Sequence, residues 1–591
     1  MASTFGILET AKSGLSVARQ NLNITGHNLS NTDTVGYTRQ RLNTSAIDPA
    51  TSTYLIAQDG TDSAGRGVEV LGIEQIRSSY LDTQFRNLNS DYSYTESRAQ
   101  ALTYLEGLYN ELDDDSGLTT AIKNFFSALN TFSNDTSSQE YRTNVQQQAL
   151  SLTESFNIVY GEMTDLWNDQ NDSISTTADS INSMATKMAE LNSAIAQYER
   201  TGDTANDLRD ERNLLLDELS GLVNVTYCNN EDNSSMVDVQ IGGVDLVIGN
   251  TAEQIQVDSP SDHLTEINAL TSQIADANAN IALAVANGDP TADYIDEISG
   301  YLDELDQYVS TSFSQDADGI TDVTFSGVSL VSGSTPTAIE EASSVDINAW
   351  IELYRNNLSL NGEALSTSAG NVTGGELCAH MEMITETGSD NSGIPSYMVQ
   401  LNSLAREIAQ NINEIHSDGY TYPDGSQTSQ TGINFFDVPV VSDGAGGFDE
   451  DYSQITAGNF TLSDDVMSSV FNIAGSSEAV DTSADATETG NNATALLMFN
   501  DLNNSDYYGS LNSIVGQLAI AVDTNESILD TQQSLLNSVD SQRTSISGVS
   551  VDEETANLIV YQQSYNACAR MVTTIDEMMD TLVNNTGIVG R

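Results

Sequence analysis

The chain has 591 residues, a length that corresponds to several domains of ordinary size. It carries 86 acidic residues against 19 basic ones, which gives a formal net charge of -67 at pH 7. This balance excludes nucleic acid and anionic membrane surfaces as main partners, because phosphate binding needs clustered lysine and arginine. We interpret the charge as a solvated, self-repelling surface.

The cysteines, the N-terminal segment and the length of the apolar runs bear on three further features: zinc or disulfide sites, a secretion signal and membrane insertion. Cys228, Cys378 and Cys568 lie far apart and form no CxxC pair, so neither a zinc site nor a disulfide framework is predicted. The first residues lack a basic stretch followed by an apolar core, so we expect no cleavable secretion signal. No apolar run is long enough to cross a bilayer, so we expect no membrane insertion.

The first 30 residues have an apolar repeat of seven. The two series of the repeat, offset by four, are Leu8, Leu15, Leu22 and Leu29, with Thr4, Ala11, Ala18 and Thr25. Such a narrow stripe predicts a coiled-coil helix. The polar cluster NLSNTDTVGYTRQR follows, in which Gly36 gives the backbone freedom that a turn needs.

The interior alternates between helical and β patterns. Helical periodicity predicts helices over residues 92–112, 117–133, 137–200, 204–221 and 394–416, and a helical hairpin near 261–313. Alternation of apolar and polar residues predicts strands within 223–250. The segments 320–375 and 417–500 are β-like or irregular.

Two more segments with a seven-residue repeat end the chain. The first contains Ile514, Ala521, Ile528 and Leu535; the second contains Leu558, Tyr565, Val572 and Met579, with Tyr561, Cys568, Ile575 and Leu582 in the companion series. Gly548 marks a break between them, and Ser550 to Glu553 resembles a capping box. The stripes at the two ends of the chain are too narrow for a globular core, so each helix needs a partner. The simplest partner is the opposite terminus.

We therefore predict a mainly α fold with β structure. A discontinuous helical stalk, part coiled coil and part bundle, is built from both chain termini and carries a β-rich head with an inserted helical hairpin. The predicted parts are a terminal coiled-coil domain (1–50 and 545–591), a helical bundle (51–222, 376–416 and 505–544) and an outer head (223–375 and 417–504, with the hairpin near 261–313).

No catalytic constellation stands out. Cys378 and His380 form a CxH pair on a strand or turn, but no acid partner or glycine-rich elbow accompanies them. His27 lies in the terminal-helix motif and His416 lies at a helix end, where capping or packing is the simpler role. We expect no catalytic residue and no enzyme.

Metal and cofactor sites are equally weak. Asp316, Asp318 and Asp322, and separately DGAGGFDEDY, have the Asp-Gly spacing of calcium loops. Neither supplies ligands at the regular positions or the closing glutamate of an EF-hand, so acidic turns are the simpler interpretation. We predict no metal site and no cofactor.

Both ends of the chain resemble the flagellar rod and hook axial protein family. The N-terminal motif positions are Asn28, Ser30, Asn31, Thr32, Gly36, Tyr37, Thr38, Arg39 and Gln40; the C-terminal ones are Gly548, Val549, Asp552, Glu553, Glu554, Tyr561, Gln562, Tyr565 and Ala567. Two interior segments, LRDERNLLLDELS and the one from LNSLAREIAQ to NFFD, resemble the hook-associated branch of that family. Their matching positions include Asn413, His416, Gly419, Gly425, Gly432, Phe435 and Phe436. Residues 223–375 and 440–500 show no match, so the hairpin near 261–313 is interpreted as an elaboration.

The resemblance implies a structural subunit that joins hook and filament outside the cell. It implies export through the flagellar secretion channel without a cleavable signal, an export chaperone, a ring of identical copies at the hook tip, and contacts with the hook protein and a neighbouring hook-associated protein. The terminal helices would form an inner tube and become ordered when neighbours supply the missing surface. The expected assembly interface is Leu8, Ala11, Leu15, Ala18, Leu22, Leu29, Leu558, Tyr561, Tyr565, Val572, Ile575, Met579 and Leu582. Open alternatives are another rod or hook subunit, an enzyme head on a flagellar stalk, and a secreted coiled-coil adhesin.

Overall fold

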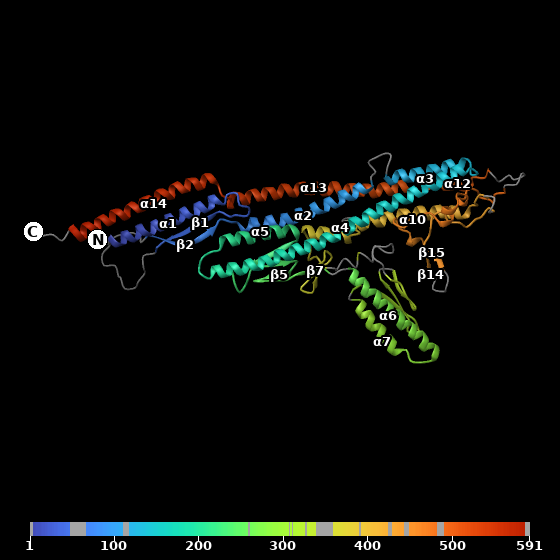
Figure 1. Cartoon of the computed structure of the whole chain (residues 1–591), viewed down its shortest axis with the longest axis horizontal. Coiled ribbons are helices and arrows are strands. Elements are labelled where there is room, and N and C mark those ends of the chain that lie inside the picture. The colour runs from blue at the N-terminus through green and yellow to red at the C-terminus, as the bar shows by residue number, and fades with distance from the viewer. Residues whose placement is uncertain are drawn as a thin grey trace, which may run out of the picture. The chain divides into compact units, whose positions relative to one another are not determined.

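The computed structural model describes residues 4–47, 67–109, 117–257, 260–306, 308–309, 311–325, 328–338, 351, 358–388, 392–423, 428–442, 448–481 and 490–585 (Figure 1). The chain forms two compact units. Unit 1 contains Met1–Tyr92, Ser180–Gln254 and Thr531–Arg591, and unit 2 contains Ser93–Asp179 and Ile255–Asp530. Three of the four boundaries fall inside long helices, α2 (Ser79–Tyr109), α4 (Gln139–Glu199) and α13 (Tyr507–Ser547), and the fourth lies between Gln254 and Ile255.

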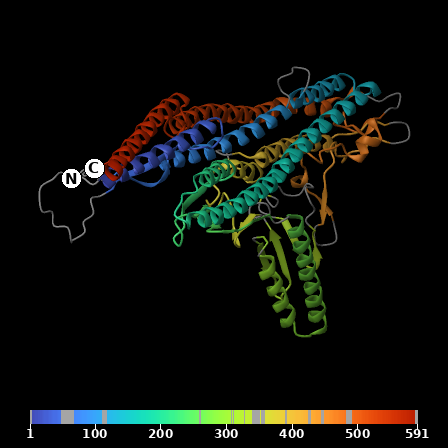
Figure 2. The ribbon, with the colours of Figure 1, turned by 60° about the vertical axis from the view of Figure 1, so that its left-hand side comes forward.

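In unit 1, the two ends of the chain lie side by side. Helix α1 (Thr4–Ser30) packs along α14 (Val551–Asp580), as Figures 1 and 2 both show. Strands β1 (Gln40–Ala46) and β2 (Val68–Gln75) pair in antiparallel fashion and contact α1. The pairing of the two termini, predicted from their narrow apolar stripes, is therefore present in the fold.

The rest of unit 1 combines helices with a small sheet. It contains the end of α4, helix α5 (Asn206–Leu222) and four antiparallel strands in chain order: β3 (Val225–Asn229), β4 (Val237–Ile241), β5 (Val244–Ile248) and β6 (Thr251–Ala252). Alternate residues of β4 are buried, so the sheet presents one apolar face to the core.

Unit 2 is built around a helical bundle. Its helices include α3 (Gly117–Asn134), α9 (Gly375–Thr385), α10 (Ile394–Asp418) and α12 (Ala493–Asn504), with the first part of α4. Fully buried aromatic rings fill its core; Phe125 lies 5.7 Å from Phe435 and 5.9 Å from Phe436 between ring centroids. Such ring pairs stabilise a core beyond their buried area.

The remainder of unit 2 is a helical hairpin with a second four-stranded sheet, and several short elements. The hairpin is α6 (Pro260–Asn287) and α7 (Ala292–Leu305), and the sheet is β8 (Thr311–Gln315), β9 (Thr321–Phe325), β10 (Val328–Ser332) and β11 (Thr335–Pro336). The short elements are β7 (Ile255–Val257), β12 (Leu358–Leu360), β13 (Glu363–Ala364), β14 (Val440–Ser442), β15 (Phe448–Glu450) and α11 (Asp464–Ser468).

The predicted fold class, mainly α with β, is confirmed, with several local errors. Helix α12 begins at Ala493, inside the segment 417–500 that was predicted to be β-like or irregular. Helix α2 begins at Ser79, well before the predicted residue 92. Its first turns bury polar side chains, including Arg86 and Ser90, so the apolar period that would have revealed the helix is interrupted. Strand β2 lies in a segment that was predicted to be helical bundle. The division into three domains stays a prediction.

The apolar register predicted for α13 holds only at its start. Of the predicted positions, Ile514, Leu511 and Leu518 are buried, and Ala521 is partly buried. Further along the predicted series, Ile528 is 44% exposed and Leu535 is 49% exposed. The apolar stripe of α13 therefore continues along the helix past the part that other elements of the described chain bury.

Asn413 of α10 holds the irregular segment that follows the helix. Its Oδ1 accepts hydrogen bonds from the backbone N–H groups of Phe435 (2.9 Å) and Phe436 (2.7 Å), and its Nδ2 donates to the carbonyl of Phe436 (2.9 Å). The amide satisfies backbone groups that no strand pairs. This motif position thus has a structural role.

His416, one turn further along α10, has the same kind of role and makes stability depend on pH. Its Nε2 accepts the N–H of Ala474 (2.8 Å), and its Nδ1 donates to the carbonyl of Ile433 (2.7 Å). Burial lowers its pKa to about 4, from about 6.5 in an unfolded chain. As the pH falls, His416 takes up a proton in the unfolded chain near pH 6.5 but in the folded chain only near pH 4. The stability that comes from burying the neutral imidazole is therefore complete above about pH 6.5 and falls as the pH drops towards 4.

Lowering the pH from 7 to 4 should, through His416, decrease the free energy of unfolding of unit 2 by roughly 3 kcal/mol. Denaturant unfolding at both pH values should show the loss in the natural chain and a smaller loss in His416→Gln. His27→Gln, which changes a half-exposed histidine of unit 1, is the control. An unchanged pH dependence in His416→Gln would contradict the assignment.

Candidate functional site

The α1–α14 pair brings most of the predicted seam residues together. Ala11, Ala18 and Ile575 are almost completely buried. The partly buried members are Leu8, Leu15, Leu22, Leu29, Leu558, Tyr561, Tyr565, Val572 and Met579. Leu582 lies beyond the end of α14 and is 53% exposed, so the pair itself does not bury it. The seam is thus only partly covered within one chain.

Small side chains let the two terminal helices approach closely. A Cβ atom added to Gly14 would lie only 3.0 Å from the Sγ atom of Cys568 on α14. Ala11 and Ala18 lie one turn away on either side of Gly14 along α1. Cys568 is therefore a small packed side chain of the seam, and its thiol is free.

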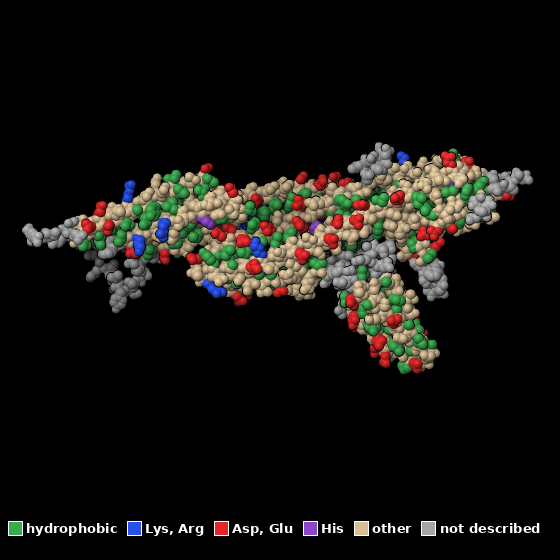
Figure 3. Space-filling model, viewed as in Figure 1, with side chains coloured by type: hydrophobic (Ala, Val, Ile, Leu, Met, Phe, Trp, Pro, Cys, Tyr) green, Lys and Arg blue, Asp and Glu red, His purple; other side chains and the backbone are tan. Residues whose placement is uncertain are grey.

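Helix α14 also carries apolar side chains that this chain leaves exposed. The members are Ile559 (51% exposed), Val560 (58%), Met571 (47%) and Met578 (45%). A shallow groove of about 630 Å³ runs along the helix and is lined by residues that include Ile7, Met571 and Met578. Figure 3 shows hydrophobic side chains at the surface over the terminal helices. An apolar helix face of this kind is typical of an interaction surface.

Asn28 ties the extended segment after α1 to the helix. Its Oδ1 accepts the N–H of Gln40 (3.0 Å), and its Nδ2 donates to the carbonyl of the same residue (3.0 Å). The hydroxyl of Tyr37 also donates to Oδ1 (2.8 Å). Only an amide both donates and accepts here, which explains asparagine at this buried motif position.

The other N-terminal motif residues end the helix and form the turn. Ser30 Oγ donates to the carbonyl of Gly26 (2.8 Å), and Asn31 Nδ2 donates to the carbonyl of His27 (3.0 Å). Gly36 has φ of 80°, a conformation that favours glycine. These side chains satisfy the carbonyl groups that the end of α1 leaves free.

The start of α14 is capped in the way that the sequence indicates. Ser550 accepts the N–H of Glu553 at 3.4 Å, and acidic residues Asp552, Glu553 and Glu554 occupy the first turn, where the helix dipole favours negative charge. At Gly548 the chain is tight, because an added Cβ would lie 2.5 Å from the carbonyl oxygen of Thr544. The break between α13 and α14 therefore needs glycine.

Arg39 joins the N-terminal and C-terminal motifs. Its backbone N–H donates to the carbonyl of Ser547 (2.8 Å). Its guanidinium contacts Glu553 (Nη1–Oε2 2.8 Å) and Glu554 (Nε–Oε1 3.0 Å), and the Glu554 side chain is only 3% exposed. We call Arg39, Glu553 and Glu554 the anchor, because they hold the extension after α1 against the start of α14.

A second group of charges lies beside the anchor. Asp217 of α5 accepts Arg86 Nε (2.7 Å) on one oxygen and Arg543 Nη1 (2.7 Å) on the other. The Arg543 guanidinium also lies 4.1 Å from the centre of the Phe85 ring. One carboxylate thus connects α2, α5 and α13 within unit 1.

Asp210 of α5 contacts the extension directly. Its Oδ2 accepts the N–H of Thr38 at 3.0 Å, and burial raises its pKa to about 6. Sequence reasoning placed Asp210 and Asp217 in the segment LRDERNLLLDELS without assigning them a partner, and it did not single out Arg86 or Arg543. Their signal was the scarcity of basic residues, since an arginine in so acidic a chain is an obvious partner for a buried carboxylate.

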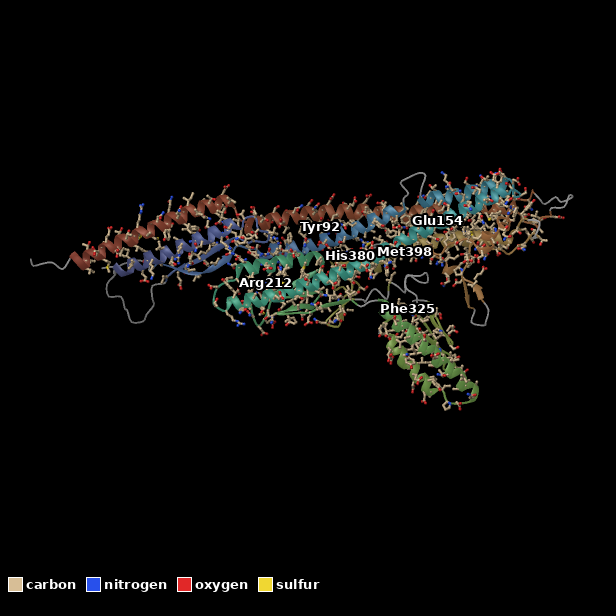
Figure 4. All side chains as sticks on the ribbon, in the orientation of Figure 1. Tyr92, Glu154, Arg212, Phe325, His380 and Met398 are labelled. Carbon is tan, nitrogen blue, oxygen red and sulfur yellow. The ribbon has the colours of Figure 1, made fainter. Side chains whose placement is uncertain are left out.

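The CxH pair does not form a catalytic dyad. Cys378 and His380 lie two residues apart on helix α9, not on a strand or turn as predicted, so they point to different sides. Burial raises the pKa of the Cys378 thiol and lowers the pKa of His380 to about 4. His380 Nδ1 lies 2.8 Å from Gln170 Oε1, and Figure 4 places this histidine.

The carboxylates of the acidic loop at Asp316 accept hydrogen bonds from backbone N–H groups of nearby residues. Asp316 Oδ1 accepts the N–H groups of Asp318 and Ile320, both at 2.9 Å, and Asp322 Oδ1 accepts the N–H of Gly333 (2.6 Å). Across the described residues, no group of three or more metal-ligating side chains comes together. Part of the DGAGGFDEDY segment lies outside the described residues.

Among the helices in the described ranges, none is long and apolar enough to span a membrane.

Comparison with known families identifies the class. Residues 8–38 match the flagella basal body rod protein family, and residues 540–585 match the C-terminal family of the flagellar basal body rod FlgEFG proteins. These are the two segments that form the α1–α14 pair and its anchor. The chain is therefore an axial protein of the bacterial flagellum.

The interior identifies the family. The helical domain of the flagellar hook-associated protein FlgK matches residues 102–263 and 258–436, more than half of the chain. The chain belongs to the flagellar hook-associated protein FlgK family. Flagellar hook-associated protein 1 of Bacillus subtilis is 28% identical over 599 residues and is covered completely, as is this chain. The Salmonella typhimurium protein of the same name is 24% identical, over 98% of this chain and 99% of its own length.

A solved structure has the same fold. The flagellar hook junction protein FlgK from Burkholderia pseudomallei aligns with a TM-score of 0.51 and 14% sequence identity, over 78% of this chain and 100% of that chain. The resemblance seen in the sequence is thus confirmed. The chain is a structural, hook-associated protein of the flagellum, part of its axial structure outside the cell, and not an enzyme.

Proposed function

We propose that the chain forms the junction between hook and filament and assembles there through its terminal helices. The observation that carries this proposal is the α1–α14 pair, which is half-buried along its seam and exposes Ile559, Val560, Met571 and Met578 on α14. A helix pair with this much uncovered apolar surface gains stability when neighbouring subunits cover it. The heptad side chains are the surface that neighbours would complete.

The partners follow from the same family. We propose a ring of identical copies at the hook tip, in contact with the hook protein below and with a neighbouring hook-associated protein above. The chain would reach this site through the flagellar export channel with the help of an export chaperone. Terminal helices that become ordered only among neighbours delay self-association until the chain reaches the assembly site.

The test separates the outer face of α14 from the fold itself. In cells lacking the natural chain, the double variant Met571→Asp/Met578→Asp should leave hooks without filaments, non-motile cells and flagellin in the medium. Both side chains are about half exposed, so the circular dichroism of the purified variant should be unchanged. Ile158→Asp, at a position of α4 that is 58% exposed, should assemble normally.

Each alternative has its own result. Normal filaments on cells that make only the double variant would show that the α14 face is not the assembly surface. Absence of hooks in cells without the chain would assign it to the rod or hook. Full filaments in those cells would rule out the junction role.

A further inference from the structure

Two stretches of this chain have the same succession of elements. The first module (residues 180–252) contains the end of α4, then α5, then strands β3 to β6; the second module (residues 260–336) contains α6, α7 and strands β8 to β11. Both sheets are antiparallel with the strands in chain order. Figure 2 shows the second module as two helices beside its strands.

The helical parts of the two modules also share sequence at a constant separation of 86 residues. A Gly-Asp pair follows the first helix of each module, and both glycines have positive φ (Gly202 at 91° and Gly288 at 77°). The second helix of each module contains Asp-Glu-Leu, as Asp217–Leu219 and as Asp303–Leu305. In both copies the leucine is completely buried.

One buried asparagine joins helix and sheet in each module. In the first module, Asn192 Nδ2 donates to the carbonyls of Val237 (2.7 Å) and Gly249 (2.6 Å), and its Oδ1 accepts the N–H of Val237 (3.2 Å). Asn278, 86 residues later, makes the same three bonds in the second module. Its partners are Thr321 O (2.7 Å), Gly333 O (2.6 Å) and Thr321 N (2.8 Å).

The strand register agrees as well. Val239 of β4 pairs with Val247 of β5, and Val323 of β9 pairs with Val331 of β10; in both sheets the register shifts at the next residue. The two modules thus share a bulge, a register and a helix–sheet asparagine, in addition to the order of their elements. We infer that the second module is a second copy of the first.

The first module shows what its outer face binds. Asp217 of α5 and Tyr227 of β3 together hold Arg86 of α2. The Arg86 Nε lies 2.7 Å from Asp217 Oδ1, and its guanidinium carbon lies 4.5 Å from the centre of the Tyr227 ring. The Tyr227 hydroxyl is 3.1 Å from the Thr83 hydroxyl one turn earlier on α2. A carboxylate and an aromatic face thus form a receptor for an arginine on a helix.

The second module keeps both parts of this receptor without an occupant. Asp303 and Phe313 stand at the positions equivalent to Asp217 and Tyr227, on α7 and β8. Both are exposed, and Phe313 is 61% exposed. Within the described ranges, Asp303 forms neither an ion pair nor a hydrogen bond. The exposed phenylalanine ring is apolar surface left in water, and at the positions equivalent to Tyr227 and Asp217 the ring and the carboxylate match a cationic partner.

We propose that the α7–β8 face of the second module is a docking surface for an arginine-bearing helix of a different protein. A second copy of this chain cannot supply its own Arg86, which is 3% exposed and already bound. The net charge of -67 also favours a partner that brings positive charge. The occupant is therefore a helix that presents an arginine in the way that α2 does. This proposal is independent of the assembly role of α1 and α14.

The test uses the full chain and a labelled peptide with the sequence of residues 79–92, the part of α2 that fills the first receptor. Fluorescence anisotropy should show saturable binding. Asp303→Asn or Phe313→Ala in the chain, and Arg86→Gln in the peptide, should each weaken it at least about fivefold. The peptide is only partly helical in water, which lowers its affinity equally for every variant.

Two matched variants control for general attraction. Glu297→Gln removes an exposed charge of α7 whose equivalent, Glu211, pairs with Lys187 rather than with α2. Leu283→Ala removes an apolar side chain of α6 that is 62% exposed. Both should bind within about twofold of the natural chain.

Three results would overturn the proposal. The first is binding that Asp303→Asn and Phe313→Ala leave unchanged, which would place the peptide in the first receptor. The second is an equal loss in the control variants, which would indicate unspecific attraction to an acidic surface. The third is self-association of the chain in sedimentation equilibrium that Asp303→Asn abolishes, because the occupant would then be a second copy.

Discussion

Replacing Val572 with aspartate should prevent incorporation of the chain at the hook tip while unit 2 stays folded. Val572 lies half-buried in the α14 seam against α1, and the seam positions around it are occupied by uncharged side chains. A carboxylate in this position must either lose its hydration or push the helices apart, at a cost of about 2–3 kcal/mol. Leu22→Asp, from the α1 side, should have the same effect.

The controls place the same charge beside the seam instead of in it. Asn23→Asp and Thr573→Asp change exposed neighbours of the two residues. Electron microscopy of complemented cells should show filaments for both controls and bare hooks for both seam variants. Near-ultraviolet circular dichroism checks that the aromatic core of unit 2 is intact. Normal filaments with Val572→Asp and Leu22→Asp would remove the seam assignment.

Arg39→Ala should destabilise the anchor by about 3–5 kcal/mol, the typical cost of leaving a buried charge without its partner. Its partner Glu554 is 3% exposed, so water cannot replace the guanidinium. Hydrogen exchange should then be faster in residues 37–46 and at the start of α14. Arg39→Lys should recover only part of the protection, because one ammonium group cannot reach both glutamates in the geometry of a guanidinium.

Two further variants make this result specific. Arg39→Ala combined with Glu554→Leu removes both charges and should recover most of the lost stability. Arg41→Ala breaks a pair between exposed side chains, Arg41 with Glu74 at 3.4 Å, and should cost less than about 1 kcal/mol. If Arg39→Ala costs no more than Arg41→Ala, the anchor contributes nothing beyond an ordinary surface pair.

The terminal helices and their pairing could be predicted from the sequence because the information is local and periodic. A seven-residue repeat restricts each helix to one narrow apolar stripe, and only another helix can cover it. The turn at Gly36, the break at Gly548 and the cap at Ser550 are equally local. The stripe of α13 shows the limit, because periodicity alone did not indicate that Ile528 and Leu535 would be exposed.

The charged contacts of unit 1 could not be predicted in the same way. Arg86, Asp217 and Arg543 come from distant parts of the chain, and their burial depends on a geometry that no local pattern encodes. The same buried charges hid the start of α2, because arginine and serine interrupt its apolar period. Strand β2 was missed because its partner β1 is separated from it in sequence by residues 47–67, so no hairpin pattern marks the pair.

The sequence by itself determined the family and the terminal helices, since both depend on short motifs and periodic stripes. It did not reveal that the predicted elaboration near 261–313 repeats the preceding module. Short matches such as Gly-Asp and Asp-Glu-Leu recur by chance in so acidic a chain. The tertiary structure decided this point, because shared register and shared asparagine hydrogen bonds require many residues to agree in space at once.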